Sequence, residues 1–156
     1  MAGPKRARPF IAWLLIVLHF LMGIGGIVSG GMLVVAPDGK YLGWTESLLQ
    51  GSPFTNYLIP GLILVILIGF FPIFVGWGIL TLPSWRWPDA INPTKRFHWS
   101  WSASWAAGVI MLVWILVELF MVGYLGFLQP MVIVWGMVEI VLTVMPAMRR
   151  YCFRAV

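Results

Sequence analysis

Residues 9–36 have the sequence PFIAWLLIVLHFLMGIGGIVSGGMLVVA, which contains no Asp, Glu, Lys or Arg. A helix needs about 20 consecutive apolar residues to cross the hydrocarbon core of a bilayer, so this run is long enough for one crossing. The basic residues Lys5, Arg6 and Arg8 before it resemble the start of a signal peptide. However, the apolar core of a signal peptide has only about 7–15 residues. We therefore expect a membrane helix here.

The composition of the whole chain agrees with a membrane location. Of the 156 residues, 61% are hydrophobic and 10% are charged, whereas a soluble globular domain carries about 25% charged residues. So few charges cannot cover a water-exposed surface, so much of the exterior must face lipid. The length suits a single domain, and we expect one membrane domain covering residues 1–156.

Three further apolar runs follow the first, with a short segment of mixed polarity between the first two. The four expected helices cover residues 9–36, 53–82, 100–122 and 130–148. Residues 41–50 are expected to lie in the membrane interface, with Trp44 as an anchor. Pro72 lies in the middle of the second helix and removes one backbone hydrogen bond, which predicts a kink. The fold class expected is an all-α bundle of four transmembrane helices.

The basic residues predict the orientation of this bundle. Nine of them fall at the N-terminus, in the middle loop or at the C-terminus, and only Lys40 falls on the opposite side. The nine are Lys5, Arg6, Arg8, Arg86, Lys95, Arg96, Arg149, Arg150 and Arg154. Short loops rich in Lys and Arg stay in the cytoplasm. Both termini are therefore expected to be cytoplasmic.

Small residues at spacing four indicate where the helices approach one another. Gly26 and Gly30 lie on one face of the first helix, and Ser104 and Gly108 on one face of the third. In lipid, close backbone packing across such faces drives helix association. We expect these residues to pack inside the bundle. The alternative is that the Gly26 and Gly30 face binds another membrane protein or a second copy of this chain.

Three ionisable residues fall inside the apolar runs, namely His19, Glu118 and Glu139. Such residues are costly in a bilayer, usually face the bundle interior and mark functional sites. At a rise of about 1.5 Å per residue, His19 and Glu139 both lie about 15 Å from their nearest helix end, near the midplane. Glu118 lies only about 6 Å from its helix end. The sharper hypothesis is a His19–Glu139 pair, extended by Glu118, that forms a candidate intramembrane polar site. The alternative is that each residue is satisfied separately.

Several classes of function have no support in the sequence. No zinc, Walker or nucleophile-elbow motif occurs, so no catalytic residue, metal ligand or cofactor is predicted. His98 belongs to a different depth from His19, which argues against a haem held by two histidines. The basic residues are not gathered on one surface, as a nucleic-acid site requires. Cys152 is the only cysteine, and we expect it to be an inert thiol, with juxtamembrane lipidation as the alternative.

One stretch resembles a known group of proteins. Residues 51–61, GSPFTNYLIPG, follow the segment WTESLL at residues 44–49. This combination resembles an uncharacterised family of small bacterial four-helix integral membrane proteins, with the Gly-Ser-Pro-Phe element before the second helix as the distinctive part. The resemblance implies a bacterial inner-membrane protein with several membrane passes. It carries no catalytic residue over to this chain.

Two functions are expected from these observations. The first is a non-enzymatic accessory or assembly subunit of a larger membrane complex, since the chain is small and its loops are short. Its partners would be membrane lipids and the helices of other membrane proteins. The second is a small carrier or binder of a lipophilic or protonatable solute, with His19, Glu118 and Glu139 as its site and Pro72 as a point of mobility.

Overall fold

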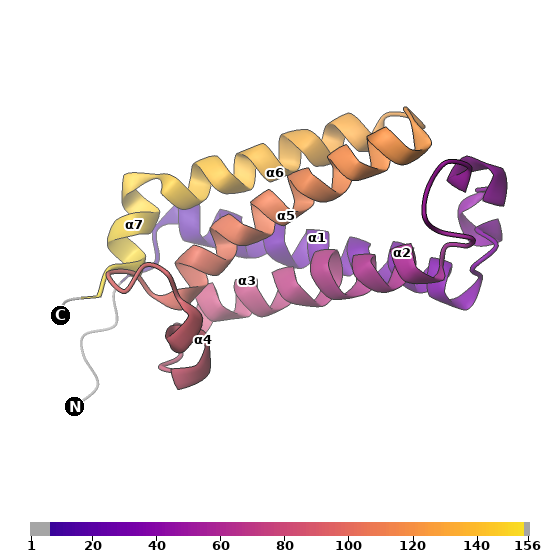
Figure 1. Cartoon of the computed structure of the whole chain (residues 1–156). Helices are drawn as coiled ribbons and strands as arrows, with labels where there is room; N and C mark the ends of the chain where they lie inside the picture. Colours follow the sequence, from indigo (N-terminus) through magenta and orange to yellow (C-terminus); the bar gives the residue numbers. More distant parts are fainter. Residues whose placement is uncertain (1–6, 155–156) are drawn as a thin grey trace.

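The computed structural model describes residues 7–154, and the regular elements within this range are helical (Figure 1). They are α1 (Phe10–Val35), the short 3-10 turns η1 (Lys40–Leu42) and η2 (Glu46–Leu49), α2 (Leu58–Ile63), the π-helical η3 (Leu64–Phe70), α3 (Phe71–Thr81), α4 (Arg86–Ile91), α5 (Trp99–Val122), α6 (Leu128–Val144) and α7 (Pro146–Cys152). An isolated β-bridge joins Phe97 and Phe153. The predicted all-α class is therefore present.

Three helices are long and apolar enough to cross a membrane: α1, the continuous segment Leu58–Thr81 and α5. A fourth span exists if α6 and α7 count as one helix, but these two are bent by 62° relative to each other. The sequence predicts an unbroken helix from 130 to 148, and this is wrong at Met145. Pro146 disfavours the helical conformation in the residue before it, and Met145 is extended, with φ −58° and ψ 144°.

The second span departs from the expected bounds in a different way. It begins at Leu58 instead of residue 53, because Ser52 and Phe54 form a side-chain turn in which the Phe54 N–H donates to Ser52 Oγ (3.2 Å). The predicted disturbance at Pro72 takes the form of a π-helical segment just before it, where Phe71 N–H donates to the Ile66 carbonyl five residues back. A π turn of this kind commonly marks an irregular point in a helix.

The helices form two hairpins (Figure 1). In the first hairpin, α1 lies along α2, η3 and α3; in the second, α5 lies along α6. Glycine makes the first contact close: a Cβ at Gly26 would lie 2.6 Å from the Ile68 carbonyl carbon, and one at Gly30 would lie 2.7 Å from the Gly61 carbonyl oxygen. Gly108 has the same role in the second hairpin, where an added Cβ would lie 3.0 Å from the Gly136 carbonyl oxygen. These faces are thus used inside the bundle.

We call the end of the bundle formed by residues 7–9, 82–98 and 153–154 the terminal end, and the end formed by residues 36–57 and 123–127 the loop end. The two hairpins lie close together at the terminal end and diverge toward the loop end (Figure 1). Lys5 and Arg6, which count toward the predicted orientation, lie outside the described residues.

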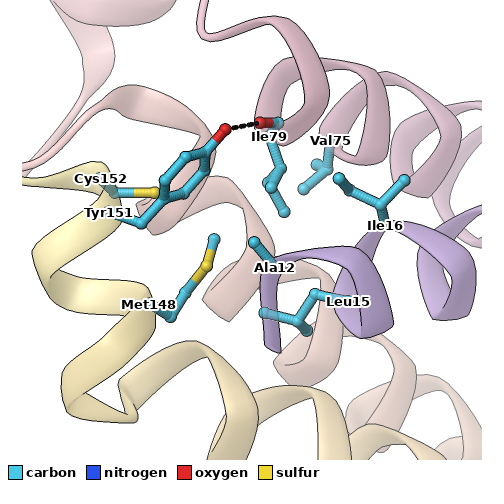
Figure 2. Close-up of a cluster of buried hydrophobic side chains, with 8 residues drawn as sticks. All are labelled: Ala12, Leu15, Ile16, Val75, Ile79, Met148, Tyr151 and Cys152. Carbon is cyan, nitrogen blue, oxygen red and sulfur yellow. Dashed lines mark hydrogen bonds between the residues drawn. The ribbon is translucent and has the colours of Figure 1, made fainter. Parts of the chain in front are cut away.

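A buried apolar cluster holds the terminal end together (Figure 2). It joins side chains of α1, α3 and α7, and its members are Ala12, Leu15, Ile16, Val75, Ile79, Met148, Tyr151 and Cys152. The Tyr151 hydroxyl donates to the Ile79 carbonyl at 3.1 Å. The bend before α7 therefore has a structural consequence, because it turns this short helix onto the first hairpin.

Polar contacts also fasten the segment between the hairpins to the C-terminal residues. His98 N–H donates to the Cys152 carbonyl at 2.8 Å, and Arg154 N–H donates to the Arg96 carbonyl at 2.9 Å. The Arg154 guanidinium also reaches both carboxylate oxygens of Asp89, at 2.8 and 2.9 Å. Both hydrogen bonds come from one nitrogen, Nη2, and they hold Asp89 of α4 against the C-terminal residues.

Candidate functional site

The structure brings His19 and Glu139 together between α1 and α6. His19 Nδ1 lies 3.3 Å from Glu139 Oε1, and both side chains are fully buried. The two residues lie in the half of the bundle where the hairpins are close, since Ser104 of α5 is also in contact with His19. The pair suggested by their equal estimated depths is therefore present in the fold.

Two hydroxyl groups extend this pair into a polar network that spans three helices. His19 Nε2 lies 2.8 Å from Ser104 Oγ, and Ser104 Oγ lies 2.7 Å from Thr143 Oγ1. Thr143 then donates to the Glu139 carbonyl one turn earlier in α6, at 2.7 Å. Ser104 and Thr143 are fully buried. We call these four residues the buried polar network.

Two tryptophans donate hydrogen bonds to residues of the buried polar network. The Trp135 indole N–H donates to Glu139 Oε1 at 3.2 Å, and the Trp101 indole N–H donates to the Thr143 backbone carbonyl at 2.8 Å. Even so, the contact between His19 Nδ1 and Glu139 Oε1 is not a hydrogen bond. Among residues 7–154, His19 Nδ1 and Glu139 Oε2 are buried polar atoms with no hydrogen-bond partner.

Glu118 does not join this network. It lies on α5 near the loop end, where it is partly exposed and accepts a hydrogen bond from Gln129 Nε2 at 3.1 Å. Gln129 is itself fixed, because its amide also donates to the Gly123 carbonyl at 3.0 Å and accepts from Leu125 N–H at 2.8 Å. The hypothesis of one polar site with three ionisable residues is therefore wrong for Glu118.

Two cavities lie between the diverging hairpins, and Glu118 lines both of them. The smaller, of about 400 Å³, lies on the side of α2 and η3. The larger, of about 660 Å³, lies on the side of α1 and α6 and includes Gln129 and Trp135 in its wall. Trp44 from the loop and Trp114 from α5 also line both. The wall of the smaller cavity is otherwise almost entirely apolar, and that of the larger one is mostly apolar but includes Ser29.

Sequence reasoning named some of these residues for other reasons and missed others. Ser104 was expected to be a packing residue, and it also carries the central hydroxyl of the buried polar network. Trp135, Glu139 and Thr143 are spaced by four and share one face of a helix. That spacing is the signal by which Trp135 and Thr143 could have been found.

Among residues 7–154, no group of three His, Cys, Asp or Glu side chains is arranged to hold a metal ion. No family model, curated protein or solved structure matches this chain. The interpretation of the site therefore depends on its own geometry.

Proposed function

We propose that this protein is a four-span membrane protein that binds a lipophilic molecule between its two hairpins. The observation that carries the proposal is the pair of apolar cavities at the loop end, whose walls meet at Glu118. A cavity of several hundred Å³ with apolar walls and a few fixed polar groups is the usual form of a small-molecule site.

The polar groups in the wall indicate the class of ligand. Gln129 donates a hydrogen bond to Glu118, and this bond holds its carboxylate in place on the cavity wall. A carboxylate in an apolar environment is stabilised by a cation or a hydrogen-bond donor. We therefore propose a ligand with a long apolar part and a polar end that is an amine or a hydroxyl.

The proposed topology places both termini and the middle loop in the cytoplasm, with the loop end outside. The nine-to-one distribution of basic residues supports it. Under this topology Glu118 and the cavities belong to the outer half of the bilayer, and the ligand enters from the outer leaflet. In bacteria, a C-terminal green fluorescent protein fusion is expected to fluoresce, and a C-terminal alkaline phosphatase fusion is expected to be inactive.

The proposed role is binding or carriage and does not include a chemical reaction. A bacterial inner membrane remains the proposed location, on the strength of the resemblance of residues 44–61. That the protein is an accessory subunit of a larger membrane complex stays a separate prediction. It would be supported if native mass spectrometry of the extracted protein gave a larger assembly of fixed stoichiometry.

The binding proposal is tested with three probes of equal chain length: octadecylamine, stearyl alcohol and stearic acid. Native mass spectrometry of the purified protein should give the order amine, alcohol, acid from tightest to weakest. Glu118→Gln should weaken amine binding about tenfold, which corresponds to ~1.4 kcal/mol. The control is Glu46→Gln, since Glu46 is exposed in the loop at the same end and lines neither cavity. Equal binding of the three probes, or an unchanged amine affinity in Glu118→Gln, would overturn the proposal.

A further inference from the structure

Hydrogen-bond accounting fixes the direction of the buried polar network. A carbonyl only accepts, so Thr143 must use its single hydroxyl proton to donate to the Glu139 carbonyl. Ser104 must then donate its own proton to Thr143 Oγ1. This leaves Ser104 Oγ as the acceptor toward His19, so His19 Nε2 carries a hydrogen and donates it.

The other ring nitrogen is left with an unmet requirement. A neutral imidazole that is protonated at Nε2 has only a lone pair at Nδ1. Nδ1 lies 3.3 Å from Glu139 Oε1, and an ionised carboxylate there would place two acceptors against each other. One proton between the two groups removes the conflict, whether it resides on the carboxyl or on the ring.

Nothing else on the packed helices can neutralise the pair. α1, η3 and α3 hold no ionisable residue besides His19, and α6 holds none besides Glu139. On α5 the only one is Glu118, which is 14 positions from Ser104 and so about 21 Å along the helix. On α7, Arg149 and Arg150 are exposed at the terminal end, while Tyr151 and Cys152 are buried there in the apolar cluster.

From this geometry we propose that His19 and Glu139 form a binding site for a single proton inside the membrane, held between His19 Nδ1 and the Glu139 carboxyl. The two unpartnered buried atoms of the network, His19 Nδ1 and Glu139 Oε2, belong to the two groups that share it. Burying a neutral acid beside a neutral base costs less than burying two separated charges. The resting state is therefore Glu139 protonated and donating to His19, and a small rotation of the carboxyl completes that hydrogen bond.

Trp135 and Ser104 are positioning residues for this site. Trp135 donates to Glu139 Oε1 and so favours the carboxyl proton on the other oxygen, Oε2, while Ser104 accepts from Nε2 and so fixes the tautomer of the ring. Neither His19 nor Glu139 lines either of the two cavities, and of these four residues only Trp135 does.

The test is ¹⁵N NMR of the full chain in lipid nanodiscs with labelled histidine. The chain has two histidines, so His98→Asn assigns the signals of His19. At neutral pH, Nε2 is expected to show a directly bonded proton, and Nδ1 to show the signal of a hydrogen-bonded acceptor. Glu139→Met, which has no hydrogen-bond donor, should move the Nδ1 signal toward that of a free acceptor, and Glu118→Gln should leave it in place.

Two results would overturn the proposal. One is an unchanged Nδ1 signal in Glu139→Met. The other is a wild-type spectrum in which His19 Nε2 carries no proton or His19 Nδ1 has no hydrogen-bond partner. This second result does not require the variant to fold. Either would mean that the pair does not hold a shared proton.

Discussion

The two halves of the bundle each contain one carboxyl group on an apolar helix, and the two groups have different surroundings. Glu139 is fully buried and its neighbours are His19, Thr143 and Trp135 of the same chain. Glu118 is partly exposed and lines two cavities. The difference arises because the two hairpins pack against each other at the level of Glu139 and diverge at the level of Glu118. A carboxyl in a membrane helix thus serves the protein's own network or an external molecule according to how closely its neighbours pack.

The largest expected effect comes from separating the helices of the first hairpin. Gly30→Leu would place a Cβ 2.7 Å from the Gly61 carbonyl oxygen and 2.8 Å from the Val65 nitrogen, both of them backbone atoms that cannot move aside. We expect a loss of about 3 kcal/mol or more, because overpacking forces the backbone to shift. Unfolding in mixed micelles with increasing dodecyl sulfate measures it.

The matched control is Gly31→Leu, one position along α1, where a Cβ meets nothing within 4 Å. It should change the unfolding free energy by only about 0.5 kcal/mol, as is usual for surface substitutions. Equal effects at the two positions would mean that α1 does not approach the second span through Gly30.

The next largest loss of stability is expected from breaking the buried polar network. Ser104→Ala removes the acceptor of the His19 Nε2–H and the donor to Thr143, and it leaves the buried ring N–H unpaired. An unsatisfied buried donor costs about 1–3 kcal/mol. Ser29→Ala is the control, because the Ser29 hydroxyl donates only to the Gly25 carbonyl of its own helix (2.8 Å). If both variants unfold at the same dodecyl sulfate concentration, the network adds no stability.

The sequence predicts the helical runs well, because a span of apolar residues has to be about as long as the bilayer is thick. Hydropathy is less informative about where a helix ends. The break at Met145 was missed although Pro146 marks it, since the apolar run continues through the proline without a change of composition. Residues 53–57 were included in a helix because Ser52 and Pro53 have the pattern of a helix start.

The candidate site was predictable in depth but not in direction. Counting residues places His19 and Glu139 at one level of the bilayer, and the structure pairs them. The same count says nothing of helix rotation, which decides that Ser104 and Thr143 turn toward His19. Glu118 is kept out of the network by its depth, about 21 Å along α5 from Ser104, and meets Gln129 of α6 instead. The cavities were also out of reach, since they come from the divergence of two hairpins and not from any local pattern.

A smaller effect is expected from filling the larger cavity near the loop end. Val132 lines the larger cavity, whereas Val134, on the same helix, is 54% exposed and lines neither cavity. Val132→Phe should lower octadecylamine affinity about fivefold, or ~1 kcal/mol, because the larger ring occupies space the ligand needs. Val134→Phe should leave it unchanged. An unaltered affinity in Val132→Phe, measured by native mass spectrometry, would move the ligand out of this cavity.

The smallest effect is a change in the free energy of unfolding with pH. It comes from His98, which lies at the terminal end and precedes α5. His98 Nε2 lies 2.9 Å from the Pro83 carbonyl and must donate to it, so Nδ1 is the acceptor for Ser100 N–H at 3.2 Å. The ring thus caps the helix in its neutral form. Burial lowers the pKa of His98; the hydrogen bond to Pro83 opposes this, nearby Arg154 adds to it and nearby Asp89 opposes it.

The sign of the pH effect follows from that lowered pKa. The unfolded chain takes up a proton at about pH 6.5, before folded His98 does, so acid favours the unfolded state. The contribution of His98 is complete above about pH 6.5 and is lost as the pH falls toward the lower pKa of the folded protein. His98→Asn keeps a capping side chain without a titrating group, so its unfolding free energy should fall less between pH 7 and pH 5 than that of the wild type. Parallel curves for the two proteins would mean that the ring titrates alike in both states, and that the segment next to α5 is open to water instead of held against Pro83.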